Sequence, residues 1–264
     1  MKFALSLTAA CLFALNASAN SLTMWVPDKE ILKSLTSEWA EFVEEGSDGE
    51  IEINFTDMEN IRALTAVKSG EIDMALISPK SSDGFNPFSV FELPITALDN
   101  IAASQAAADF IDYAGDTEAF EDTKILSAWL DMITFKMTDE ILGGDMAALM
   151  IAFLEPATWQ GTSYQLVMNA EAYQALPLDL QSVLDENSGR ALAEYAATQM
   201  ADVTPEKAVI VNRQTLASIP EEAQAILQQN VRPVVAEWLS QAEQAGYNGF
   251  ELLETSARLL QENN

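Results

Sequence analysis

The chain has 264 residues, 49% of them hydrophobic, and its 41 acidic and 13 basic residues give a net charge of −28. This hydrophobic content supports a packed core and excludes global disorder, and the charge argues against nucleic acid or anionic membrane as a partner. The chain has no histidine and one cysteine, Cys11, which rules out Ser-His triads, disulfides within the chain and the usual zinc ligands. We therefore expect no cofactor, no metal site and no catalytic residues.

The first residues have the features of an export signal. Lys2 precedes an apolar run over residues 3–15, and Ala17-Ser18-Ala19 forms a small-x-small cleavage site. We expect cleavage after Ala19, so that residues 1–19 are a signal peptide and Cys11 is lost with them. A lipid anchor at Cys11 is the weaker alternative, because Thr8 stands where a large aliphatic residue is expected.

The next hundred residues alternate between strand and helix patterns. Apolar residues alternate over 22–26 and 51–55, recur at helical spacing over 31–43 and 61–67, and run almost continuously over 72–77. This βαβαβ order predicts a mostly parallel sheet covered by helices. Trp39 and Phe42 fit the apolar face of the first helix and are predicted to be core residues. Asp73, at the start of a buried strand, is predicted to bond backbone amides nearby.

Ligands in such sheets gather at the carboxyl ends of strands. Trp25 and the loop over residues 78–86 lie at such ends, and the loop is equally consistent with a cleft wall and with a plain surface connection.

Further along the chain, the patterns predict a helix over 98–113, a strand over 124–130 and a strand over 164–169. A continuous helix from Pro177 to Met200 is expected next, because apolar residues recur across more than four turns. A short strand over 209–211 and helices over 220–246 and 250–260 complete the prediction.

Four segments in register resemble periplasmic substrate-binding proteins of TRAP (tripartite ATP-independent periplasmic) transporters. The segments are SGEIDMALISP (69–79), FELP (91–94), the run VMNAEAYQALPLDLQSVLDENSGRALAEYA (167–196) and the tail over 231–260. The resemblance implies an α/β fold of the two-lobed periplasmic-binding-protein type, with parallel-rich sheets and a long spine helix joining the lobes. It also implies a location in the periplasm and delivery of a small organic acid to TRAP membrane subunits.

On this basis residues 20–130 form the first lobe, completed by residues 216–264. Residues 131–215 form the second lobe and the spine helix. We expect a monomer or a weak homodimer.

The chain departs from the family in the second lobe. Most of that lobe's core block is absent between Phe135 and Pro156, so the second lobe is expected to be reduced. The arginine that pairs with the substrate carboxylate in the family is missing with it. The resemblance therefore assigns the anchoring role to no residue.

Lys136 is the candidate replacement, because it is the only cation between Lys124 and Arg190 and follows the strand that leads into the second lobe. Since an ammonium cannot form the planar paired bonds of a guanidinium, weaker binding is expected. The aromatic residues predicted to surround the cleft are Trp25, Phe91, Trp129, Trp159 and Tyr164.

The sequence leaves two alternative function classes. A degenerate paralogue would keep the fold, bind no small acid and act as a periplasmic interaction protein. An enzyme is disfavoured, because paired acids such as Glu44 and Glu45 occupy adjacent helical positions and do not face each other.

Overall fold

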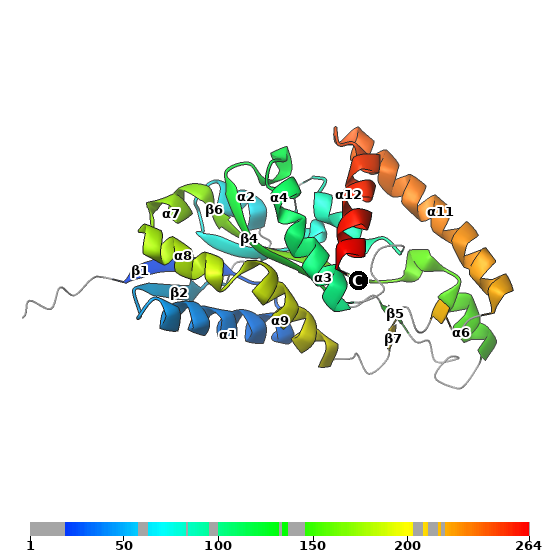
Figure 1. Ribbon diagram of the computed structural model, residues 1–264, viewed down its shortest axis with the longest axis horizontal. Helices are drawn as coiled ribbons and strands as arrows, with labels where there is room; N and C mark the ends of the chain where they lie inside the picture. Colours follow the sequence, from blue (N-terminus) through cyan, green and yellow to red (C-terminus); the bar gives the residue numbers. More distant parts are fainter. Residues whose placement is uncertain are drawn as a thin grey trace, which may run out of the picture.

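A computed structural model describes residues 19–57, 63–82, 84–94, 100–131, 134–136, 146–202, 208–210, 216–217 and 220–263. Helices cover both faces of a central sheet, and a long helix stands away from it (Figure 1). The described part includes no helix that is long and apolar enough to cross a membrane.

The central sheet has five strands in the order β2-β1-β3-β6-β4. They are β1 (Asn20–Trp25), β2 (Ile51–Phe55), β3 (Met74–Ile77), β4 (Thr123–Leu130) and β6 (Ser163–Asn169). Strand β1 pairs in parallel with β2 and β3, as the βαβαβ pattern predicts, whereas β6 runs antiparallel to both β3 and β4. Strand β6 lies between β3 and β4, so a strand from residues 131–215, the range predicted for the second lobe and the spine helix, belongs to this sheet. The division of the chain into lobes stays a prediction.

One face of the sheet is covered by α1 (Glu30–Gly46), α8 (Leu178–Glu186) and α9 (Gly189–Asp202). Helices α1 and α9 are seen below the sheet in Figure 1. The other face is covered by α2 (Ala63–Lys68), α3 (Asn100–Asp109), α4 (Ile111–Ala114), α12 (Gly249–Glu262) and the 3-10 helix η2 (Pro87–Glu92). Within that second core, Phe88 lies edge-on to Phe110 and Phe120 at ring distances of 5.3 and 5.6 Å. This aromatic cluster fixes η2 against the sheet.

The prediction of one continuous helix from Pro177 to Met200 is wrong. After the short helix α7 (Ala170–Ala175), this range forms two helices, α8 and α9. The break before α9 falls at Gly189, whose φ of +58° lies in the left-handed region that favours glycine. The carbonyl groups at the break are bonded, since Trp39 Nε1 donates to Asn187 O at 2.9 Å and Ser127 Oγ donates to Gly189 O at 2.8 Å. Both α8 and α9 pack on the helices and strands of the large sheet.

Two predictions about single residues have opposite outcomes. Asp73 Oδ2 accepts hydrogen bonds from the backbone N–H and the hydroxyl of Thr23, each at 2.7 Å, which confirms its structural role between β1 and β3. Phe42 was predicted to be core and is 48% exposed, because it lies at the edge of the apolar stripe of α1, where its ring packs edge-on with that of Tyr195.

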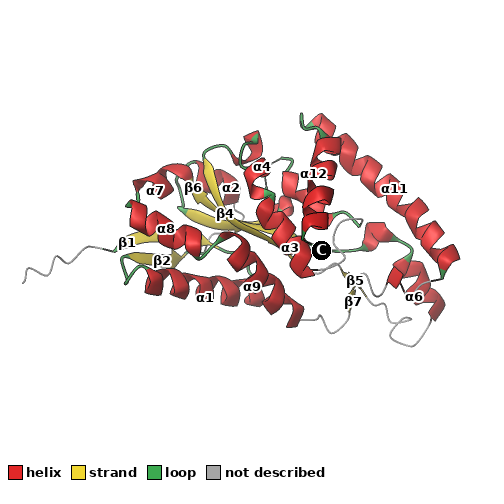
Figure 2. Cartoon of the chain, in the orientation of Figure 1, coloured by secondary structure: helices red, strands yellow, loops and turns green. Residues whose placement is uncertain are grey.

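A second, smaller group of elements lies away from the central sheet. Strand β5 (Thr134–Lys136) pairs antiparallel with β7 (Ala208–Ile210), and α6 (Met146–Phe153) and the 3-10 helix η4 (Pro156–Thr158) lie close to α11 (Glu221–Gln244). Figure 2 shows this two-stranded sheet beside the much larger one. The arrangement agrees with a two-lobed architecture whose second sheet, in the part of the chain described, has two strands.

Candidate functional site

Three strand ends meet at one edge of the central sheet. Because β6 is antiparallel to its neighbours, its first residues lie beside the last residues of β3 and β4. Gln165 pairs with Ile77, and Ser163 pairs with Leu130. This is the carboxyl edge of the parallel strands, where ligands of open α/β sheets bind.

On one face of β6, Tyr164 meets a cation that follows β1. Lys29 Nζ donates to Tyr164 Oη at 2.7 Å, and the tyrosine ring lies 6.1 Å from the indole of Trp129. Burial is the main cause that raises the pKa of the Tyr164 hydroxyl above its usual value. The phenol therefore stays neutral at physiological pH and holds the lysine ammonium at the strand edge.

On the other face of β6, two amides form a buried network. Asn86 Nδ2 donates to Gln165 Oε1 at 2.9 Å, and Asn86 Oδ1 accepts from Phe88 N at 2.9 Å, which caps η2. Gln165 is fully buried, and its Nε2 has no hydrogen-bond partner among the described residues. A buried donor without a partner costs about 1–3 kcal/mol, so an acceptor at this place would stabilise the site.

The carboxylate of Glu92, at the end of η2, reaches the start of β6. Its Oε1 accepts from Ser163 N at 2.9 Å and from Ser163 Oγ at 3.4 Å. Burial raises the pKa of Glu92 above its ordinary value, and the Ser163 hydrogen bonds and the charge of Lys80 partly oppose this. The charged form of Glu92 is thus disfavoured by its surroundings.

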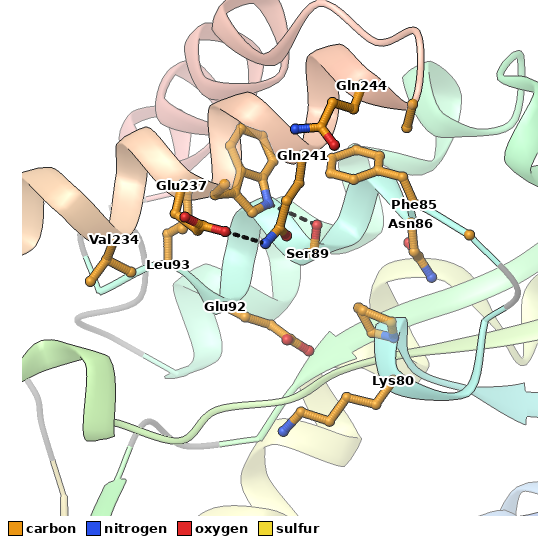
Figure 3. Close-up of a pocket in the computed structure, with 14 residues that line it drawn as sticks. Lys80, Phe85, Asn86, Ser89, Glu92, Leu93, Val234, Glu237, Gln241 and Gln244 are labelled. Carbon is orange, nitrogen blue, oxygen red and sulfur yellow. Dashed lines mark hydrogen bonds between the residues drawn. The ribbon is translucent and has the colours of Figure 1, made fainter.

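A pocket of about 680 Å³ opens between the segment over 79–93 and helix α11. Figure 3 shows Lys80 and Glu92 directed into it from one side and Glu237 and Gln241 from the other. Phe85 and Trp238 form an aromatic wall with ring centroids 5.6 Å apart, and Trp238 Nε1 donates to Ser89 Oγ at 2.9 Å. The pocket thus combines an aromatic surface, one cation and several amide and carboxyl groups, and its volume suits a small organic ligand.

The sequence-predicted residues are only partly brought together. Trp25, Trp159 and Tyr164 lie near the strand-end edge, where both tryptophans are half-buried and Tyr164 is 2% exposed. Phe91 and Trp129 are fully buried: Phe91 packs 5.3 Å from Phe110, and Trp129 packs against Tyr164. A ligand cannot reach these two side chains in this conformation, so we assign them to packing.

Lys136 is described only through its backbone, which pairs with Ala208 in the β5–β7 ladder. Its side chain lies outside the described part of the structure, and its role as an anchor stays a prediction.

Sequence reasoning missed Lys29, Lys80, Glu92 and Gln165. Lys80 could have been found from the sequence, because it lies in the loop that follows β3. A cleft wall was one of the two interpretations of that loop. Lys29 also follows a strand end. Glu92 and Gln165 had no such signal, since their placement depends on the insertion of β6 between β3 and β4.

The described residues include no group of three or more acidic, cysteine or histidine side chains that could hold a metal ion.

This chain has the fold of TRAP solute-binding proteins. The sequence itself matches no protein-family model and no curated protein. A TRAP solute-binding protein from Rhodoferax ferrireducens, in complex with copurified benzoate, superposes with a TM-score of 0.68 at 19% identity, over 92% of this chain and 98% of that chain.

A marine metagenome TRAP solute-binding protein specific for aromatic acid ligands, in complex with metahydroxyphenylacetate, gives a TM-score of 0.70 at 17% identity, over 92% and 99% of the two chains. A Bordetella bronchiseptica protein of the same kind, with bound mandelate, gives a TM-score of 0.63 at 16% identity over the same shares.

Proposed function

We propose that the protein is an extracytoplasmic solute-binding protein that captures a small organic acid and delivers it to the membrane subunits of a TRAP transporter. The observation that carries the proposal is the fold itself. It is shared over about nine-tenths of the chain with TRAP solute-binding proteins, several of which hold benzoate, mandelate or a hydroxylated aromatic acid.

The electrostatics of the chain favour a local anion site. A protein with a net charge of −28 repels organic anions at long range, so it needs a cation at the site to hold one. Lys29 and Lys80 follow β1 and β3 and supply such charges at the strand-end edge. Lys136, which follows β4, is a third candidate anchor.

The aromatic surfaces favour a ligand with an apolar body. Phe85 and Trp238 line the pocket, and Trp25 and Trp159 lie half-buried near the strand ends. Flat rings stack on such surfaces, so aromatic monocarboxylates are the first acids to test.

Export fits this function. The signal features of residues 1–19 support a periplasmic location after cleavage behind Ala19, and binding and release require no catalytic step. We propose that the mature chain acts as a monomer or weak homodimer, and that it is not an enzyme.

Thermal unfolding of the mature chain with a panel of mono- and dicarboxylates tests the proposal. A ligand present at a hundred times its Kd adds about 2.7 kcal/mol of stability. For a chain of this size that corresponds to a rise in Tm of roughly 5–10 °C. An amine of similar size, such as benzylamine, is the control and should cause no shift.

The same assay separates the alternatives. A degenerate paralogue that acts as an interaction protein shows no shift with any acid. A binder whose Lys136→Ala variant keeps the full shift rules out Lys136 as the anchor, while loss of the shift supports it. Lys33→Ala is the matched control, because Lys33 is a surface lysine that pairs with Asp28 at 2.8 Å.

A further inference from the structure

Lys80 and Glu92 both enter the pocket described above from the side opposite α11. Lys80 comes from the 3-10 helix η1 (Pro79–Ser81), directly after β3, and Glu92 is the last residue of η2. Their side chains point into the same space (Figure 3). Lys80 is exposed and forms no hydrogen bond or ion pair with a described residue, so its ammonium is available to a ligand.

Glu92 presents only one of its oxygens to the protein. Both bonds from Ser163 go to Oε1, and Oε2 accepts no hydrogen bond from a described residue. If Glu92 were ionised, its carboxylate would repel the carboxylate of a ligand held on Lys80 in the same pocket. If Oε2 carried a proton, it would instead donate a hydrogen bond to that ligand.

We propose that an organic acid places its carboxylate on Lys80 Nζ and that Glu92 takes up one proton as the acid binds. The inference rests on the proposed function and adds a mechanism for the same site. The proton comes from the solvent, goes to Glu92 Oε2 and returns to the solvent when the acid leaves, and no covalent bond to the ligand forms or breaks.

The surroundings of Glu92 favour this exchange. Burial already raises the pKa of the carboxyl, and an approaching anion raises it further. Among the described residues, the charged or titratable groups on the elements around it include Lys80 from η1, Glu237 from α11, Tyr164 from β6 and Asp131 after β4. Helix α12, which also packs on η2, carries Glu251 and Glu254 at exposed positions. Of these groups, Glu237 is the other acid that lines the pocket. Its Oε1 accepts a hydrogen bond from Gln241 Nε2 at 3.2 Å, which keeps the carboxylate of Glu237 close to the surface of α11.

The sign of the pH dependence follows from linkage. The complex binds one proton more than the free protein, so affinity falls as pH rises above the pKa of Glu92 in the free protein. The expected slope is at most about one decade in Kd for each pH unit.

Calorimetric titration of the mature protein with benzoate, between about pH 6 and about pH 8, tests the proposal. Comparing phosphate with Tris, whose ionisation enthalpies differ, counts the protons exchanged. We expect uptake of up to about one proton for each benzoate bound, with Kd weakening by up to tenfold for each pH unit. The Glu92→Gln variant should bind without proton uptake and with a Kd that is independent of pH. The control Glu41→Gln, at an exposed position of α1 that does not line the pocket, should keep both effects.

Lys80→Ala should weaken benzoate binding by about tenfold or more, because a charge-assisted bond is lost. Wild-type binding without proton uptake overturns the inference and leaves the proposed function intact. Absence of binding by any carboxylate of the panel overturns the proposed function and this inference together. The proton count uses the wild-type protein, so it holds even if Glu92→Gln fails to fold.

Discussion

Replacing Phe88 by alanine tests the packing that holds the candidate site in place. Phe88 is fully buried, and its ring contacts those of Phe91, Phe110 and Phe120. Removing a buried phenylalanine ring costs about 3–5 kcal/mol through lost transfer energy and the cavity left behind. Phe42→Ala is the matched control, because Phe42 is 48% exposed and should cost about 1 kcal/mol or less.

Urea unfolding followed by far-UV circular dichroism measures both variants. The Phe88 variant should lose about 3–5 kcal/mol, equivalent to a fall in Tm of roughly 6–20 °C. Because Phe88 N–H is bonded by Asn86 and η2 carries Glu92, ligand binding should fall as well. Equal losses of stability in the two variants would contradict the prediction, since it depends on the difference in burial between Phe88 and Phe42.

Three further predictions concern single positions. Asp73→Ala should destabilise the protein by about 2–4 kcal/mol, because it removes both bonds to Thr23 between β1 and β3, whereas Asp73→Asn should recover part of the loss; chemical unfolding of both variants checks this. Gly189→Ala should lower the stability by about 1 kcal/mol or more, because a residue with a Cβ is strained at the positive φ of this position. A Tm equal to that of the wild type would contradict a left-handed conformation at Gly189. The raised pKa of Glu92 means that its contribution to stability is fully present below the ordinary carboxyl pKa and is lost as pH rises through the raised pKa. Glu92→Gln should flatten this part of the plot of stability against pH. An unchanged plot would argue against burial as the cause of the raised pKa.

Local patterns were sufficient to predict the first part of the fold. An acid at the start of a buried strand indicated the structural role of Asp73, but not its partner Thr23, which is 50 residues away in the sequence. Alternation over 22–26 and 51–55 identified β1 and β2. These two strand patterns depend on residues close in sequence. The two C-terminal helices were predicted for the same reason, since their apolar residues recur at regular spacing and Asn248 caps the second.

Predictions that depend on tertiary packing were less successful. The apolar spacing across Pro177 to Met200 continues through the break, but the left-handed Gly189 is stabilised by Trp39 and Ser127, which are distant in sequence. Phe91 and Trp129 were placed near the cleft by their position at strand ends or family segments, but Phe91 is buried in the core on one face of the sheet and Trp129 in the core on the other. Glu92 and Gln165 join the site only because β6 inserts between β3 and β4.

The most direct test of the central claim is calorimetric titration of the mature protein with benzoate, mandelate and a set of aliphatic mono- and dicarboxylates. The account predicts saturable binding of at least one acid at one molecule for each chain, with weakening as salt screens the lysine charges. Absence of heat and of any change in tryptophan fluorescence with every acid would contradict it, and would leave a protein that shares the fold of TRAP solute-binding proteins without capturing an organic acid.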